Sequence, residues 1–273
     1  MKKYFCLALL SLSFFISADS PNYSKPLCYN FITELSSKSL HSFNFNFTQQ
    51  IDLQCKVDSI SPIDQTPEKI TLTFKRIQGE AQYNEKKLKF DSLATNNYSL
   101  EFQSLKKLID QPISIDLNRD MSVQGPLENF KQLLHLSSLE DHFINSDLLE
   151  QILEAIFIPL KAKASPSQYP TSIYFPFKTK ANCSIHLKES PSIVQLHLDQ
   201  ALELEGLYST EAEPFSIHLT GKLKGEGKWH PKQFYAREFS LRHDLKERAE
   251  ETFFESPLIF DYAINLNLIQ SND

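Results

Sequence analysis

Glycine is scarce in this sequence of 273 residues, which contains only 6. None of them forms a GxSxG or GxGxxG motif, so neither the nucleophile turn of α/β-hydrolases nor a dinucleotide-binding loop is present. The stretch GKLKGEGKWH follows one extended segment and leads into another rather than into a helix. We therefore predict a hairpin with a bulged turn there, not a phosphate-binding loop. Trp229, the only tryptophan, is predicted to cover the end of the sheet.

Long apolar runs are also absent beyond the first twenty residues, so no later segment is expected to span a membrane. The chain opens MKKYFCLALLSLSFFISADS, with Lys2 and Lys3, a short apolar stretch and small residues near Ala18. This layout is typical of a secretory signal peptide, and its apolar run is too short for an anchor. We predict a signal peptide at residues 1–18 and export to the periplasm or the exterior, with no stable transmembrane segment after cleavage.

Basic residues are outnumbered, with 28 Lys and Arg against 34 Asp and Glu. Removal of Lys2 and Lys3 with the signal peptide makes this balance more acidic. Nucleic acids and anionic lipid surfaces are bound by clustered Lys and Arg. The composition therefore argues against both kinds of partner.

Cysteine is limited to Cys28, Cys55 and Cys183 beyond the signal peptide. They form no CxxC pair, which argues against a zinc ribbon or a thioredoxin-like site. An exported chain can keep a disulfide, but an odd number leaves one thiol unpaired. We predict that Cys28 pairs with either Cys55 or Cys183, since such a bridge would fix an otherwise loose N-terminal segment at residues 19–40.

What the sequence does contain is alternation of apolar and polar residues with a period of two, which is typical of strands with one buried and one solvated face. In the first half, residues 41–125, it is clearest in FNFNFTQQIDLQCKV, ITLTF, KKLKF and ISIDL. NRD then forms a turn into MSVQG. In the second half, residues 161–273, it is clearest in SIVQLHL, FSIHL and LIFDYAINLNL.

The period changes in the middle of the chain, at residues 126–160. Pro126 opens a segment with helical spacing, and a second helix is predicted over residues 146–157, with Ser146 or Asp147 as N-cap and Pro159 as its end. Residues 161–172 are rich in Pro and Ser and are predicted to be a connection. The expected fold is mainly β (α+β), with two strand-rich halves and a helical connector. The sheet is either a two-sheet sandwich or one antiparallel curved sheet that wraps the helix.

Three histidines, His186, His197 and His218, each lie between two aliphatic residues. Strand parity therefore places them on the solvent face, and His243 is likewise expected to be exposed. His186 and His197 would lie nearly opposite each other in a hairpin around Pro191, which makes the three histidines weak candidates for a zinc site. The other interpretation, a polar sheet face without metal, is preferred. No catalytic residues, metal or cofactor are predicted.

Several stretches together are similar to an uncharacterised family of bacterial exported β-rich proteins that share a domain of unknown function. They are FNFNFTQQIDLQCKVDSI, ITLTFKRIQGEA, KFDS, LIDQPISIDLNRDMSVQGPLENF, IFIPL and HLTGKLKGEGKWHPKQFYAREFSLRHDL, within residues 41–245. The resemblance implies an envelope location and assigns no functional residue.

Three function classes follow from these observations. The first is a non-enzymatic binding or structural protein of the cell envelope, with an unknown protein or an apolar ligand as partner. The second is a carrier of lipid or lipoprotein with a half-barrel sheet, for which the 21 Phe and 10 Tyr would line an apolar groove. The third is a metal-dependent hydrolase that uses the surface histidines. The first two are favoured.

Overall fold

The computed structural model describes residues 25–39, 43–94, 103–124, 146–164, 169–173, 179–183, 187–209, 214–233, 235–248 and 257–270. The predicted signal peptide and the predicted helix that begins at Pro126 lie outside these residues. The strands of the first half are β1 (Leu27–Ser39), β2 (Phe43–Ile60), β3 (Pro67–Tyr83), β4 (Lys86–Asp91) and β5 (Pro112–Asp116). Those of the second half are β6 (Tyr169–Ile173), β7 (Thr179–Cys183), β8 (Leu187–Glu189), β9 (Val194–Ser209), β10 (Pro214–Trp229), β11 (Ala236–Glu247) and β12 (Ile259–Gln270). The helices are α1 (Gln103–Lys106) and α3 (Ser146–Ala164).

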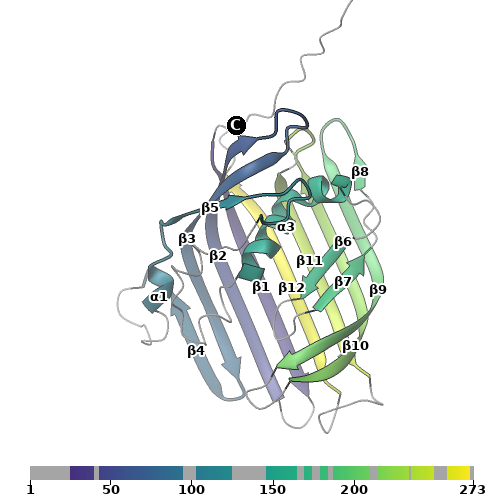
Figure 1. Cartoon of the computed structure of the whole chain (residues 1–273). Coiled ribbons are helices and arrows are strands. Elements are labelled where there is room, and N and C mark those ends of the chain that lie inside the picture. Colours follow the sequence, from purple (N-terminus) through teal and green to yellow (C-terminus); the bar gives the residue numbers. More distant parts are fainter. Residues whose placement is uncertain are drawn as a thin grey trace, which may run out of the picture.

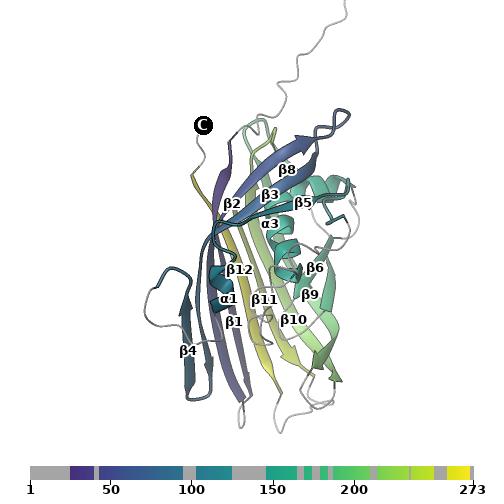
Figure 2. The same cartoon turned by 60° about the vertical axis from the view of Figure 1, so that its left-hand side comes forward.

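Ten of the strands form one open antiparallel sheet, in the order β4-β3-β2-β1-β12-β11-β10-β9-β8, with β5 paired to β3. β6 and β7 form a separate two-stranded sheet. The large sheet curls around α3, which lies on its concave face (Figures 1 and 2). The predicted mainly β fold is therefore confirmed, and of its two forms the structure has the single curved sheet.

The alternation along the strands decides which face of the sheet is buried. On β2, Ile51, Leu53 and Cys55 are buried on the concave face, while Asp52 and Gln54 between them remain partly accessible. The last strand repeats the pattern from Phe260 to Leu266. Both agree with the predicted parity, as does Phe90 on β4, whereas Leu88 on the same strand is exposed. The concave face is thus a continuous apolar surface that spans both halves of the chain.

The first strand, β1, was not predicted and is a central strand of the sheet. Residues 19–40 are predicted to be a loose segment, but β1 within them is hydrogen-bonded to β2 on one side and to β12 on the other. Its concave face carries Thr33 and Ser37 as well as Tyr29, Phe31 and Leu35, so its apolar alternation is incomplete. Because of β1, the first and last strands lie side by side and join the two halves.

The helix α3 extends past the predicted end at Pro159 and reaches Ala164, with a kink where Phe157 has non-helical dihedral angles (φ −116°, ψ 21°). Proline inside a helix removes one backbone N–H and bends the helix rather than always ending it. The predicted connection at residues 161–172 is therefore partly the last turn of α3 and partly β6, which pairs with β7.

The glycine-rich stretch GKLKGEGKW lies inside strand β10 instead of forming the predicted turn, and the turn follows at His230. Gly225 and Gly227 are on the buried face of β10. A Cβ atom at Gly227 would come closer than 3.0 Å to the ring of Trp229. These glycines therefore make room for side chains that pack across the strand, which is a second reason for glycine in a strand besides a turn.

Candidate functional site

On the concave face, at the end of β10, Trp229 meets α3. The Trp229 side chain is fully buried, and its Nε1 donates to the carbonyl oxygens of Ala155 at 3.3 Å and Ile156 at 3.1 Å. Since Pro159 has no N–H, the Ala155 carbonyl lacks its usual helical donor. The indole therefore satisfies the carbonyl that the proline leaves unpaired, and it fixes the kinked helix to the sheet. Trp229 is the last residue of β10 and pairs with the first residues of β9 and β11, which agrees with its predicted position at the end of the sheet.

A second polar contact fixes the preceding turn of α3. The Nε2 and Oε1 atoms of Gln151 lie 2.7 and 2.9 Å from the hydroxyl oxygen of Tyr262 on β12. Both side chains are buried, so the pair satisfies polar groups that would be costly to bury alone. Burial raises the pKa of Tyr262 well above its ordinary value, with the Gln151 hydrogen bond acting in the opposite direction. The hydroxyl is therefore neutral and can donate.

His243 is on the concave face, next to this pair, and not on the solvent face as predicted. It is fully buried on β11, and its ring centroid lies 5.7 Å from that of Tyr262. The reason is parity: His243 has the same parity as Leu241 and Leu245, whereas the flanking Arg242 and Asp244 point outward. Burial lowers the pKa of His243 to about 4, against a smaller opposite effect from a hydrogen bond with the Tyr262 backbone. The imidazole is therefore neutral at ordinary pH.

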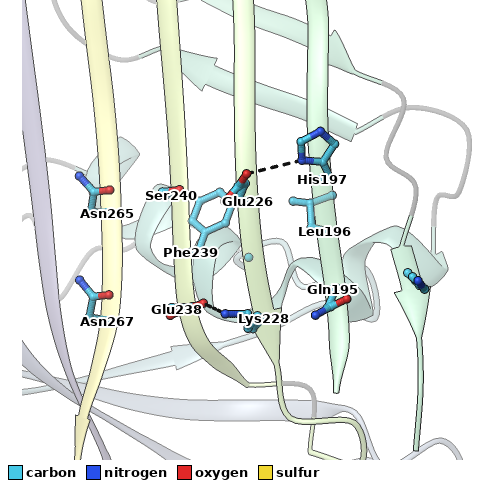
Figure 3. Close-up of a pocket in the computed structure, with 12 residues that line it drawn as sticks. Gln195, Leu196, His197, Glu226, Lys228, Glu238, Phe239, Ser240, Asn265 and Asn267 are labelled. Carbon is cyan, nitrogen blue, oxygen red and sulfur yellow. Dashed lines mark hydrogen bonds and ion pairs between the residues drawn. The ribbon is translucent and has the colours of Figure 1, made fainter. Parts of the chain in front are cut away.

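The convex face carries a shallow hollow of about 570 Å³ across strands β8 to β12 (Figure 3). Two ion pairs lie in it, Lys228 with Glu238, and His197 Nδ1 with Glu226 at 3.7 Å. Asn265 and Asn267 form its other side. The side chains of His197 and Glu226 are 77% and 76% exposed, so water screens this pair. A similar polar hollow of about 570 Å³ lies over β1 to β4 on the same face.

The predicted histidines are not brought together where the structure describes them. His197 is exposed on β9, as predicted, and is paired in register with Glu226. His218 on β10 is paired with Glu205, eight residues further along β9, or about 26 Å at a rise of ~3.3 Å per residue. His186 lies outside the described residues, although the β8–β9 hairpin around Pro191 is present. Among the described residues, no group of three or more His, Cys, Asp or Glu is placed to hold a metal ion.

The cysteines Cys28 and Cys55 are free thiols in the structure, unlike the predicted disulfide. Cys28 is paired in register with Gln54, whose Nε2 donates to its sulfur at 3.6 Å, and Cys55 is paired with Leu27. The two thiols therefore point to opposite faces of the sheet. Burial raises the pKa of Cys55 to about 12, so it stays a protonated thiol. Cys183 ends β7, and its side chain is outside the described set.

Neither a family model nor a curated protein matches the sequence. Among solved structures, the chain is similar to one described as "lipid-protein interactions in lipovitellin", with 8% sequence identity and a TM-score of 0.49. The match covers 90% of this chain and 25% of that one, so this chain spans about a quarter of its length. In the described part of the chain, no helix has the length and apolar character needed to cross a membrane.

The contacts that organise the concave face were mostly missed from the sequence. Gln151 and His243 are polar residues at positions where the periodicity expects apolar ones, and that mismatch was the available signal. Gln151 is bonded to Tyr262, and α3 is bonded to the indole of Trp229. Both partners lie on strands far from the helix in sequence. A one-dimensional pattern shows that a polar group is buried but does not show what satisfies it.

Proposed function

We propose that this chain is an exported, non-enzymatic binding protein for an apolar ligand, which it holds between the concave face of the sheet and α3. The observation that carries the proposal is α3 itself. From Leu148 to Leu160 its side chains are buried around the whole circumference of the helix, apart from Glu150 and Glu154, which are partly accessible. Glu150 and Glu154 are four residues apart and lie on one narrow polar face, and the rest of the helix circumference is mainly apolar and buried.

The sheet supports the same proposal because it is curved, open and apolar along its concave face. Its order runs from edge strand β4 to edge strand β8 without the two meeting. Phe31, Ile51, Leu223 and Phe260 are among the buried side chains that line it across both halves. Ligand sites are concave and mostly apolar, with a few polar groups that fix orientation. We call the concave face of the sheet beside α3 the trough, and it has this character.

The contacts of α3 support its exchange for a ligand. Hydrogen bonds between α3 and the sheet include those of Gln151 with Tyr262 and those of Trp229 with two carbonyl oxygens. Most other side chains of α3 are apolar, and their packing is non-directional, so a hydrocarbon chain can reproduce it. When a ligand enters beside α3, the concave face therefore contacts the apolar ligand in place of apolar side chains of α3. The N-terminal sequence supports delivery of the protein to the cell envelope, where such ligands occur.

The test uses the purified mature chain and the neutral fluorescent probe N-phenyl-1-naphthylamine. Trp229 is the only tryptophan, so energy transfer from it reports a probe bound in the trough. We expect saturable binding and a lipid in the organic extract of the protein, identified by mass spectrometry. The absence of both a co-purified lipid and saturable transfer would contradict the proposal.

A matched pair of variants separates the trough from the convex face. Leu241 and Ser240 are neighbours on β11 with side chains on opposite faces, buried and exposed respectively. Leu241→Gln is expected to weaken probe binding about tenfold or more, because it places a polar amide in the apolar surface. Ser240→Gln is expected to leave binding unchanged. Circular dichroism of both variants checks that the sheet is intact.

A further inference from the structure

Two hydroxyl groups on β1 are buried in the concave face without an acceptor or donor. Thr33 is 5% exposed and Ser37 is 0% exposed. Within the described part of the chain, neither Thr33 Oγ1 nor Ser37 Oγ has a hydrogen-bond partner. Buried polar side chains are normally paired, because an unpaired group loses its hydration without compensation. These two therefore need a specific explanation.

The neighbours of Ser37 across the sheet are apolar, whereas Thr33 has one polar and one apolar neighbour. Thr33 is flanked in register by Gln49 on β2 and Ile264 on β12, and Ser37 by Phe45 and Phe260. Leu35 lies between them on the same face. Four residues along a strand correspond to about 13 Å, so each hydroxyl is a separate point of contact. Together they are two polar points in a mainly apolar trough whose other buried polar groups include Gln49 and His243.

The charges on the buried surface restrict what such points can bind. The buried polar and charged residues of the described part are Thr, Ser, Gln, one His and one Glu, and no Lys or Arg is among them. The His is neutral and the Glu, Glu247, has a carboxylate that accepts from the backbone N–H of Leu258 at 3.0 Å. An ionised carboxylate in this trough would have no cation to balance it, which is unfavourable in an apolar site.

We infer that Thr33 and Ser37 are hydrogen-bond anchors for the uncharged ester carbonyls of a neutral acyl lipid. A hydroxyl is a donor that suits a carbonyl oxygen, and the apolar neighbours suit acyl chains. Because ester carbonyls within one glycerolipid lie closer together than ~13 Å, the two anchors bind the carbonyls of two ligands side by side. This inference rests on the proposed function and names the class of ligand, namely neutral acyl esters rather than free fatty acids.

The test compares three probes that differ only at one end: pyrenedecanoic acid, its methyl ester, and decylpyrene. Affinities are measured by pyrene fluorescence at pH 8 for the wild type and for Thr33→Val/Ser37→Ala. We expect the double variant to bind the ester about 5- to 10-fold more weakly, the loss corresponding to one or two hydrogen bonds. Binding of decylpyrene is expected to stay within twofold, and the ionised acid is expected to bind the wild type more weakly than the ester does.

The control makes the same substitutions on the convex face, at the exposed residues Thr48 and Ser240. Thr48→Val/Ser240→Ala is expected to change none of the three affinities. If the double variant on β1 binds the ester as tightly as the wild type, the anchors are refuted while the trough remains a binding site. If none of the probes binds the wild type, the inference and the proposed function both fail.

A second measurement keeps the inference testable if the double variant does not fold. The carbonyl stretching band of the ¹³C-labelled methyl ester is recorded when bound to wild-type protein. Hydrogen bonding to a hydroxyl lowers its frequency below that of the same ester in hexane. A bound ester with the hexane frequency would overturn the inference.

Discussion

The buried imidazole of His243 makes the stability of the folded protein depend on pH. Its ring is tilted by 38° against that of Tyr262, and it lies opposite Leu223 in register on the concave face. Burial disfavours the charged form, and its pKa is lowered to about 4 from an ordinary value of 6.5. The unfolded chain therefore binds a proton at a higher pH than the folded protein does.

This difference fixes the sign of a pH effect on stability. The contribution of the buried, neutral His243 to the free energy of unfolding is fully present above pH 6.5. It decreases as the pH falls from 6.5 towards 4 and changes no further below that. The loss across this window is on the order of 3 kcal/mol, from the shift in pKa. We expect urea unfolding to show a steeper loss of stability in the wild type than in His243→Phe. His197→Gln, at the exposed histidine, is the control, and equal slopes in wild type and His243→Phe would contradict the prediction.

At the scale of elements, α3 shows how a defect in one element is compensated by another. Pro159 removes a helical donor, and the kink at Phe157 turns the carbonyl oxygens of Ala155 and Ile156 towards β10. Trp229 reaches these oxygens because Gly227 leaves space beside its ring. The proline thus acts together with the glycine and the tryptophan, although Pro159 is distant in sequence from both.

A double-mutant cycle tests this relation. Trp229→Phe is expected to lower the free energy of unfolding by about 2–4 kcal/mol, through lost packing and an unpaired carbonyl. In Pro159→Ala, the new N–H at position 159 can bond the Ala155 carbonyl, so the same substitution should cost about 1 kcal/mol less. Denaturant unfolding of the four proteins measures the coupling. An identical cost of Trp229→Phe in both backgrounds would show that the indole does not replace the helical donor.

The elements that the sequence predicted well are those with complete alternation. β2 and β12 have apolar residues at nearly every concave position, so their extent and orientation were foreseen. β1 does not show the full alternation because hydroxyl residues occupy three of its concave positions, Thr33, Ser37 and Ser39. Thr33 and Ser37, which interrupt the apolar alternation, are also the residues proposed to anchor the ligand. A polar residue at a core position weakens the pattern and at the same time indicates function.

At the scale of the whole molecule, the order of strands makes the two halves depend on each other. β1 and β12 are the first and last strands among the described residues, yet they pair at the centre of the sheet over a register that runs from Cys28–Gln270 to Lys38–Ile259. Long-range pairing of this kind closes a large loop and can form only when both halves are present. The sequence suggested two similar halves around a connector, but pairing between distant strands cannot be read from local periodicity.

Native-state hydrogen exchange tests whether the sheet is one cooperative unit. Amides of β1 and β12 are bonded on both sides and should exchange only through global unfolding, whereas those of the edge strands β4 and β8 should exchange by local opening. Leu266→Ala, at a fully buried position of β12, is expected to lower the free energy of opening measured by hydrogen exchange by about 2–5 kcal/mol. Because both halves share this strand pair, the reduction should be equal in β2 and in β10. Asn265→Ala, on the opposite face, should change neither. A reduction confined to β9–β12 would show that the halves unfold separately and that the trough is not a single structural unit.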